Sequence, residues 1–305
     1  MQQIEITEGH EIYHLATPIT IEKEETIVNL EDYFLNLFNI TDVSISEGFH
    51  VDVSSDFKFV TISVLNPDIN AISYLTITTT EASYQIILLK SKKVHCVLRY
   101  NSMGKQLKSV QVGGSLNSWN PAEHYFQLKE NGVWEIEIDL EPGIYQYQLI
   151  AEGNWFCDPD NPHRADNGYG GQNSLLIVHS PYEDIEAVIF SEKAYEQSVV
   201  VLSDKPVDGY AVMWQNHLLD SKSCFINENK LMVNIPEVAQ KTRRSYLRIW
   251  AYNRGGYTND LLVPLEFGKV IQDASKLDRN DKEAQIIYFL IVERLNNCNP
   301  ENEKP

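Results

Sequence analysis

Short runs of alternating or β-branched residues recur along residues 1–270, and turn-forming Asn, Asp, Gly and Pro separate them about every 8–12 residues. Val60–Val64 and Leu75–Thr78 are typical examples. Long helical periodicity is nearly absent before residue 280. This pattern predicts an all-β chain of tandem immunoglobulin-like β-sandwich domains built from antiparallel strands.

Breaks in the pattern divide the chain into four parts. We expect an N-terminal β-sandwich over residues 1–92, ending at the polar joint Lys90–Lys93. A second sandwich is expected over 93–181 and a third over 182–270. Residues 271–305 read as a linker followed by one apolar run, which predicts the short beginning of another domain.

Composition excludes two classes of partner. The formal net charge is −18, whereas nucleic acids and anionic membranes require clustered Lys and Arg. No stretch approaches the ~18–20 apolar residues of a membrane span. Met1–Glu5 has neither the basic nor the apolar segment of a signal peptide. We therefore expect a periplasmic or secreted protein without its signal peptide, or a cytoplasmic one.

The three tryptophans of residues 93–181 stand in different surroundings. Trp134 alternates with Ile136, Ile138 and Leu140, which predicts a core position. Trp119 and Trp155 stand in turn-rich, polar segments. Such indoles either cap the open end of a sandwich or form exposed aromatic platforms of the kind that sugar rings stack on.

An ordered series of motifs surrounds these tryptophans. The motifs are Gly113–Pro121, Asn131–Glu135, Pro142–Gln148, Glu152–Trp155 and Gly170–Ser174. This series resembles carbohydrate-binding module family 48, which is related to the glycogen-binding domain of the AMP-activated kinase β subunit. The resemblance implies binding of linear α-1,4-glucans such as starch, glycogen or maltodextrins.

The resemblance also implies roles for individual residues. Trp119, in its Asn-x-Trp segment, and Trp155, after its Glu-Gly-x turn, would be the stacking platforms. Gln148 stands where the family commonly has a sugar-binding Lys, and glutamine should bond hydroxyls more weakly because it lacks charge. Asn173 matches the family's asparagine near the last strand, and Tyr169 would clamp between glucose rings.

Gln285–Pro305 gives a second resemblance. Its apolar run 286–292 suits a buried strand, and the following Glu293–Arg294 and Asn-rich loop resemble the first (β/α)8 barrel strand of glycoside hydrolase family 13. Asn297, Asn299, Asn302 and Glu303 could donate oxygens to Ca²⁺, but the departures from the family pattern lead us to expect no metal there. The sequence implies no other cofactor.

No catalytic residues are expected within these 305 residues. A retaining glycosidase needs two carboxylates about 5–5.5 Å apart, which the α-amylase family takes from later barrel strands. The resulting hypothesis is a glucan-binding, non-catalytic part of an α-amylase-type enzyme, whose partners are an α-glucan and a catalytic barrel of the same polypeptide. The alternatives are sandwiches that only brace the barrel or form a homodimer, a regulatory scaffold, or a xylan-directed module.

Overall fold

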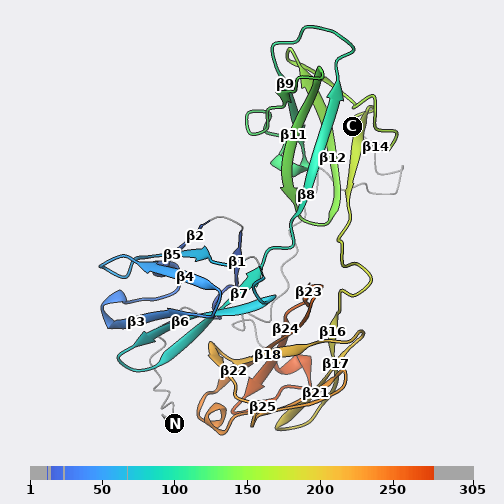
Figure 1. Cartoon of the computed structure of the whole chain (residues 1–305). Coiled ribbons are helices and arrows are strands. Elements are labelled where there is room, and N and C mark those ends of the chain that lie inside the picture. The colour runs from blue at the N-terminus through green and yellow to red at the C-terminus, as the bar shows by residue number, and fades with distance from the viewer. Residues whose placement is uncertain (1–11, 13–14, 23–24, 67, 278–305) are drawn as a thin grey trace, which may run out of the picture.

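Strands make up almost all the regular structure of this chain. The computed structural model describes residue 12 and residues 15–22, 25–66 and 68–277 (Figure 1). Within those ranges the regular elements are strands and short 3-10 helices. The predicted all-β sandwich class is confirmed, because the strands form pairs of sheets that face each other across buried apolar clusters.

The first sandwich packs two sheets around one core. One sheet has the order β1-β7-β6-β3 and the other has the order β2-β5-β4. Alternation along β6 buries every second residue, including Leu75 and Ile77, as a half-buried strand requires. The elements are β1 (Ile19–Ile21), β2 (Thr26–Asn29), η1 (Leu30–Asp32), η2 (Leu37–Asn39), β3 (Ile40–Ile45), β4 (Phe49–Val53), β5 (Phe59–Val64), β6 (Ile72–Thr79) and β7 (Ser83–Lys90).

The middle sandwich has a sheet of order β10-β11-β8 facing a sheet of order β13-β12-β15-β14, to which β9 adds by pairing with β12. Trp134 lies in the core between the sheets and is 7% exposed, which confirms its predicted position. The elements are β8 (Val94–Asn101), β9 (Val110–Gly114), η3 (Ser115–Asn117), β10 (Gln127–Leu128), β11 (Val133–Leu140), β12 (Gly143–Ala151), β13 (Asn154–Phe156), β14 (Arg164–Asp166) and β15 (Gln172–Val178).

The third sandwich pairs a sheet of order β16-β17-β21-β20 with a sheet of order β19-β18-β22-β24-β25, with β23 also pairing with β22. The elements are β16 (Ile189–Ala194), β17 (Ser198–Ser203), β18 (Gly209–Trp214), β19 (His217–Leu218), β20 (Cys224–Asn227), β21 (Lys230–Asn234), η4 (Glu237–Lys241), β22 (Arg244–Asn253), β23 (Gly256–Tyr257), β24 (Leu261–Glu266), β25 (Lys269–Val270) and η5 (Ala274–Lys276).

The first and third sandwiches share a core of their own. Ile72, Ile87 and Leu89 from the first pack against Ala211, Met213 and Trp250 from the third. The Arg248 guanidinium donates a hydrogen bond to the Ala16 carbonyl and forms an ion pair with Asp260. Figure 1 shows these two sandwiches side by side, with the middle one standing apart from both. The sequence pattern had predicted three sandwiches but no pairing between them.

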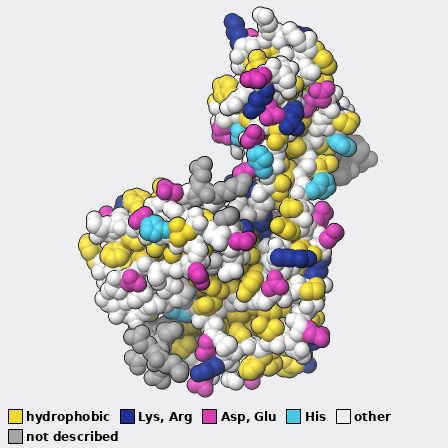
Figure 2. Space-filling view, in the orientation of Figure 1, with side chains coloured by type: hydrophobic (Ala, Val, Ile, Leu, Met, Phe, Trp, Pro, Cys, Tyr) yellow, Lys and Arg dark blue, Asp and Glu magenta, His cyan; other side chains and the backbone are white. Residues whose placement is uncertain are grey.

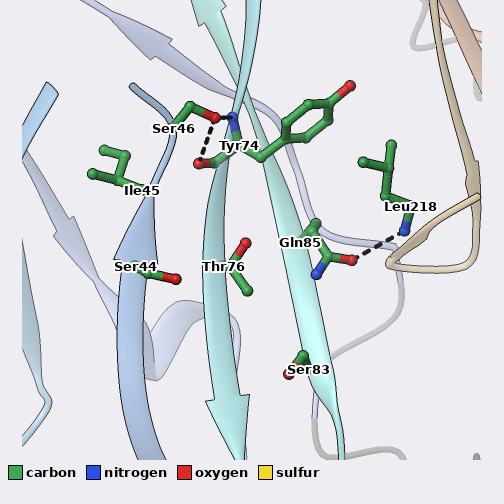
Figure 3. A pocket seen from close by; sticks show the side chains of 8 residues that line it. All are labelled: Ser44, Ile45, Ser46, Tyr74, Thr76, Ser83, Gln85 and Leu218. Atoms are coloured by element: carbon green, nitrogen blue, oxygen red, sulfur yellow. Dashed lines mark hydrogen bonds between the residues drawn. The ribbon is translucent and has the colours of Figure 1, made fainter. Parts of the chain in front are cut away.

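A shallow depression of about 410 Å³ lies beside this junction. Its lining comes from β3, β6, β7 and β19 (Figure 3). The Ser46 hydroxyl accepts from the Tyr74 amide at 2.8 Å, and the Gln85 side chain accepts from the Leu218 amide at 3.0 Å. The first of these bonds lies within the first sandwich, and the second crosses the junction to the third.

The expected barrel strand at 286–292 lies outside the described residues. Of the predicted tail segment, the described part contains only the short helix η5, and no barrel is formed by the residues that the structure describes. No helix in the described ranges combines the length and the apolar character needed to cross a membrane.

Candidate functional site

The sheet made by β9, β12 and β13 has one buried face and one outer face. On β12, Tyr147 and Leu149 point into the middle core, so the intervening Gln148 and Ile150 point outward. Ile150 is only 2% exposed although it does not belong to that core. Something on the outer face must therefore cover it.

Trp155 is the side chain placed to cover Ile150. The two residues are direct partners in the β12–β13 ladder, so their side chains share the outer face. The far edge of the indole reaches across β12 to β9, where a Cβ added to Gly113 would overlap the indole atoms Cη2 and Cζ3. Gly113 thus leaves the space in which the ring lies.

Trp119 is held in the loop that follows β9. The buried Asn117 organises this loop: its Nδ2 donates to the carbonyls of Val112 and Asn120, each at 2.9 Å, and its Oδ1 accepts from the Gly114 amide. The Trp119 amide in turn donates to the Gly114 carbonyl at 2.8 Å. These bonds fix the backbone on both sides of the indole.

The same loop contains two consecutive non-glycine residues in the left-handed region. Ser118 has φ 52° and Trp119 has φ 62°. Each such residue costs roughly 1–2 kcal/mol, which is sustained only where surrounding bonds over-determine the backbone. Strain of this kind at an exposed tryptophan is typical of a functional loop.

The two indoles come together on the outer face. Their ring centroids are 6.4 Å apart and their planes meet at 34°. Trp119 is 40% exposed and Trp155 is 44% exposed. Both rings therefore keep a large part of their surface in solvent, and together they form a bent aromatic platform of the type on which the C–H faces of sugars stack.

The structure separates the other three predicted residues. Gln148 is partly exposed on the outer face, and its amide donates to the Gln172 carbonyl at 3.0 Å. Tyr169 is 92% exposed at the tip of the loop between β14 and β15. Asn173 is only 4% exposed, and its side chain donates a hydrogen bond to the Gln146 side chain at 2.9 Å.

A buried polar network fixes the segment that follows Trp155. The Tyr147 hydroxyl donates to Asp158 at 2.6 Å and accepts from the Asn161 amide at 3.1 Å. Burial, and then the hydrogen bond to Asp158, raise the pKa of the Tyr147 hydroxyl, so it stays protonated and remains a donor. The Arg164 guanidinium donates to the carbonyls of Asp158 and Asn161, which closes the network.

The surface charge is mixed rather than basic. On the face in Figure 2, the Lys and Arg side chains of the described residues are scattered among Asp and Glu and form no continuous basic patch. Within the described ranges, no group of three or more His, Cys, Asp or Glu side chains is arranged to hold a metal ion.

Residues 94–184 match the family model described as the glycogen recognition site of AMP-activated protein kinase. The match begins with β8 and runs past the end of β15, so it covers the whole middle sandwich together with both exposed tryptophans. The middle sandwich is therefore the part of the chain that is similar to this family.

Curated relatives match part of the chain. Protein PTST homolog 2, chloroplastic, of Arabidopsis thaliana is 35% identical over 69 residues, which are 23% of this chain and 12% of that protein. The 5'-AMP-activated protein kinase subunit beta-2 of Homo sapiens is 29% identical over 116 residues, 37% of this chain and 40% of that protein. The chain thus spans well under half the length of these relatives.

Solved structures resemble the chain more loosely. The maltogenic amylase from S. marinus covers 62% of this chain and 27% of its own, with 12% identity and a TM-score of 0.28. Titin domains A168–A170 cover 85% of this chain and 97% of their own, with 10% identity and a TM-score of 0.20. Scores of this size do not establish a shared arrangement of domains.

The roles of two supporting residues were not predicted from the sequence. Gly113 was read only as part of a motif, although a glycine inside a strand often marks the close approach of another group. Asn117 was read only as the first residue of Asn-x-Trp, whereas its four hydrogen-bonding partners organise the whole loop. Their roles depend on contacts that spacing does not reveal.

Proposed function

We propose that the middle sandwich binds linear α-1,4-glucan on the platform formed by Trp119 and Trp155. The observation that carries this proposal is the pair of half-exposed indoles 6.4 Å apart, held by a strained loop on one side and by a glycine-lined strand on the other. Gln148 contacts sugar hydroxyls beside the platform, and Tyr169 closes over the chain from its loop. Asn173 supports this rim by holding the Gln146 side chain.

The expected affinity is modest. Stacking of a ring on an aromatic side chain is worth about 1–3 kcal/mol, by analogy with bases on aromatics. Two rings and a few uncharged hydrogen bonds then correspond to dissociation constants of roughly tens of micromolar to millimolar. Such a site retains a protein on a polymer that offers many equivalent segments.

Calorimetric titration of the chain with maltoheptaose tests the proposal. Saturable binding is expected, and the double variant Trp119→Ala/Trp155→Ala should abolish it. Tyr182→Ala serves as the matched control, because Tyr182 is also an exposed aromatic, at 48%, but lies in the segment after β15. Absence of binding by the unaltered chain up to millimolar sugar would refute the proposal, and preferential retention on xylan would redirect it to another polysaccharide.

A purely structural role is the main rival, in which both indoles are buried against a neighbouring surface. Within this chain the two indoles are 40% and 44% exposed, so the platform is open to a ligand. The shared core of the first and third sandwiches supports a division of labour, in which these two form a base that holds the middle domain outward.

We also propose that this base adjoins an α-amylase-type catalytic barrel. The support is the sequence pattern of Gln285–Pro305, with its apolar run followed by Glu293–Arg294 and an Asn-rich loop. The alternative is a regulatory or scaffolding protein that binds glucan and has no hydrolase domain. Reading the coding sequence past residue 305 distinguishes them, since a barrel with its carboxylate pair is expected only in the first case.

A further inference from the structure

Tyr125 lies on the same outer face as the two tryptophans. It forms a β-bridge with Gln111 on β9 and is 53% exposed. Its neighbour Phe126 is 5% exposed and belongs to the middle core. Because successive residues of an extended segment point to opposite sides, Tyr125 must point outward, on the side of Gln111.

The strand register places Tyr125 in one row with Trp155. Gln111 pairs with Ile150, and Ile150 pairs with Trp155, so all these side chains share the outer face. The far edge of the Trp155 ring lies over Gly113, two residues along β9 from Gln111. Tyr125 and Gly113 are therefore diagonal neighbours on adjacent strands, about 7–8 Å apart.

The backbone between Trp119 and Tyr125 is fixed to the same strand. The side-chain Nε2 of Gln111 donates to the Pro121 carbonyl at 3.0 Å, and the backbone amide of Val112 donates to the His124 carbonyl at 3.2 Å. The Phe126 amide donates to the Val110 carbonyl at 2.8 Å. Tyr125 is thus presented on a held segment and not on a free loop.

We propose that Tyr125 is a third aromatic contact, which extends the stacking surface to a glucose residue beyond those on Trp119 and Trp155. The inference rests on the proposed function of that platform. Phe126 fills the adjacent core position, and about half of the Tyr125 surface stays in solvent, so its ring is open to a ligand. A tyrosine loses little side-chain entropy on binding and combines an apolar ring with a hydroxyl, which suits a sugar.

The consequence is a dependence of affinity on glucan length. A short chain occupies only the two indoles, whereas a longer one also reaches Tyr125. Removing the tyrosine ring should therefore weaken the binding of long glucans and leave the binding of short ones unchanged. Removing Trp155 should weaken both.

The test compares maltotetraose with maltoheptaose by calorimetric titration of the full chain and of Tyr125→Ala, Tyr125→Phe, Trp155→Ala and Tyr182→Ala. Tyr125→Ala should lose about 5-fold in maltoheptaose affinity, the lower end of the range for one stacked ring, with maltotetraose affinity unchanged. Tyr125→Phe keeps the ring and should stay within about 2-fold of the unaltered chain, as should the control Tyr182→Ala.

Two results overturn the inference while leaving the platform intact: unchanged maltoheptaose affinity in Tyr125→Ala, or an equal loss for both sugars. In either case Trp155→Ala still loses binding, which shows that the platform itself works. If the unaltered chain binds neither sugar, the proposed function fails and this inference fails with it. Thermal unfolding of each variant separates a loss of contact from a loss of fold.

Discussion

Replacing Gly113 by alanine should weaken glucan binding while leaving the domain folded. Gly113 lies in β9 with strand backbone, so alanine is conformationally acceptable there. The new Cβ would overlap the far edge of the Trp155 indole. Because this edge is the end of a half-exposed side chain, the ring can swing away, and we expect the indole rather than the strand to move.

The magnitude follows from the loss of one stacked ring. Displacing Trp155 should reduce the free energy of glucan binding by about 1–3 kcal/mol, which corresponds to about 5- to 150-fold weaker binding. The stability of the domain should change far less. Reduced cover over Ile150 is offset in part by the gain of about 0.4–1 kcal/mol when glycine is replaced at a compatible site.

The assay is calorimetric titration with maltoheptaose, combined with thermal unfolding of the same samples. Gly143→Ala is the matched control, because a Cβ at Gly143 meets only Tyr145, at 3.9 Å. Unchanged affinity in Gly113→Ala, beside saturable binding by the unaltered chain, would refute the idea that Gly113 positions Trp155. A loss of folding in Gly113→Ala would show instead that the strand cannot yield.

Three further outcomes follow from buried groups. Asn117→Ala should cost about 1–3 kcal/mol in the free energy of unfolding and also weaken maltoheptaose binding, because it leaves backbone groups of the Trp119 loop without partners; unchanged affinity would contradict this. Met213→Ala should lower the free energy of unfolding by about 2–5 kcal/mol. The first and third sandwiches should then unfold in one shared calorimetric transition at a lower temperature, and separate transitions for the two would contradict a common core. Burial lowers the pKa of His217 below its ordinary value of 6.5, so as the pH falls through that value the unfolded chain takes up a proton that the folded chain does not. Stability should then fall with acidification by up to ~1.4 kcal/mol per pH unit, and His217→Gln should flatten that dependence in urea unfolding measured at several pH values.

Only part of the site could be predicted from the sequence. Trp119 and Trp155 could be singled out because their polar, turn-rich surroundings do not suit a core. The contact between them could not be predicted, because it depends on the Trp155 side chain crossing β12 to lie over Gly113 on β9. For Asn173 the motif predicted a sugar contact at the rim of the site; its burial and its hydrogen bond to Gln146 depend on strand pairing that the motif does not encode.

Local alternation in the sequence determined the sandwich class, because strand period and turn residues act over only a few neighbouring positions. It determined the burial of Trp134 for the same reason. Tertiary structure alone decided that the first and third sandwiches share a core, with Met213 and Trp250 packed against β6 and β7. It also decided that Tyr125, Trp119 and Trp155 lie on one face. Both arrangements are set by register and packing between segments distant in the chain, and no local pattern encodes them.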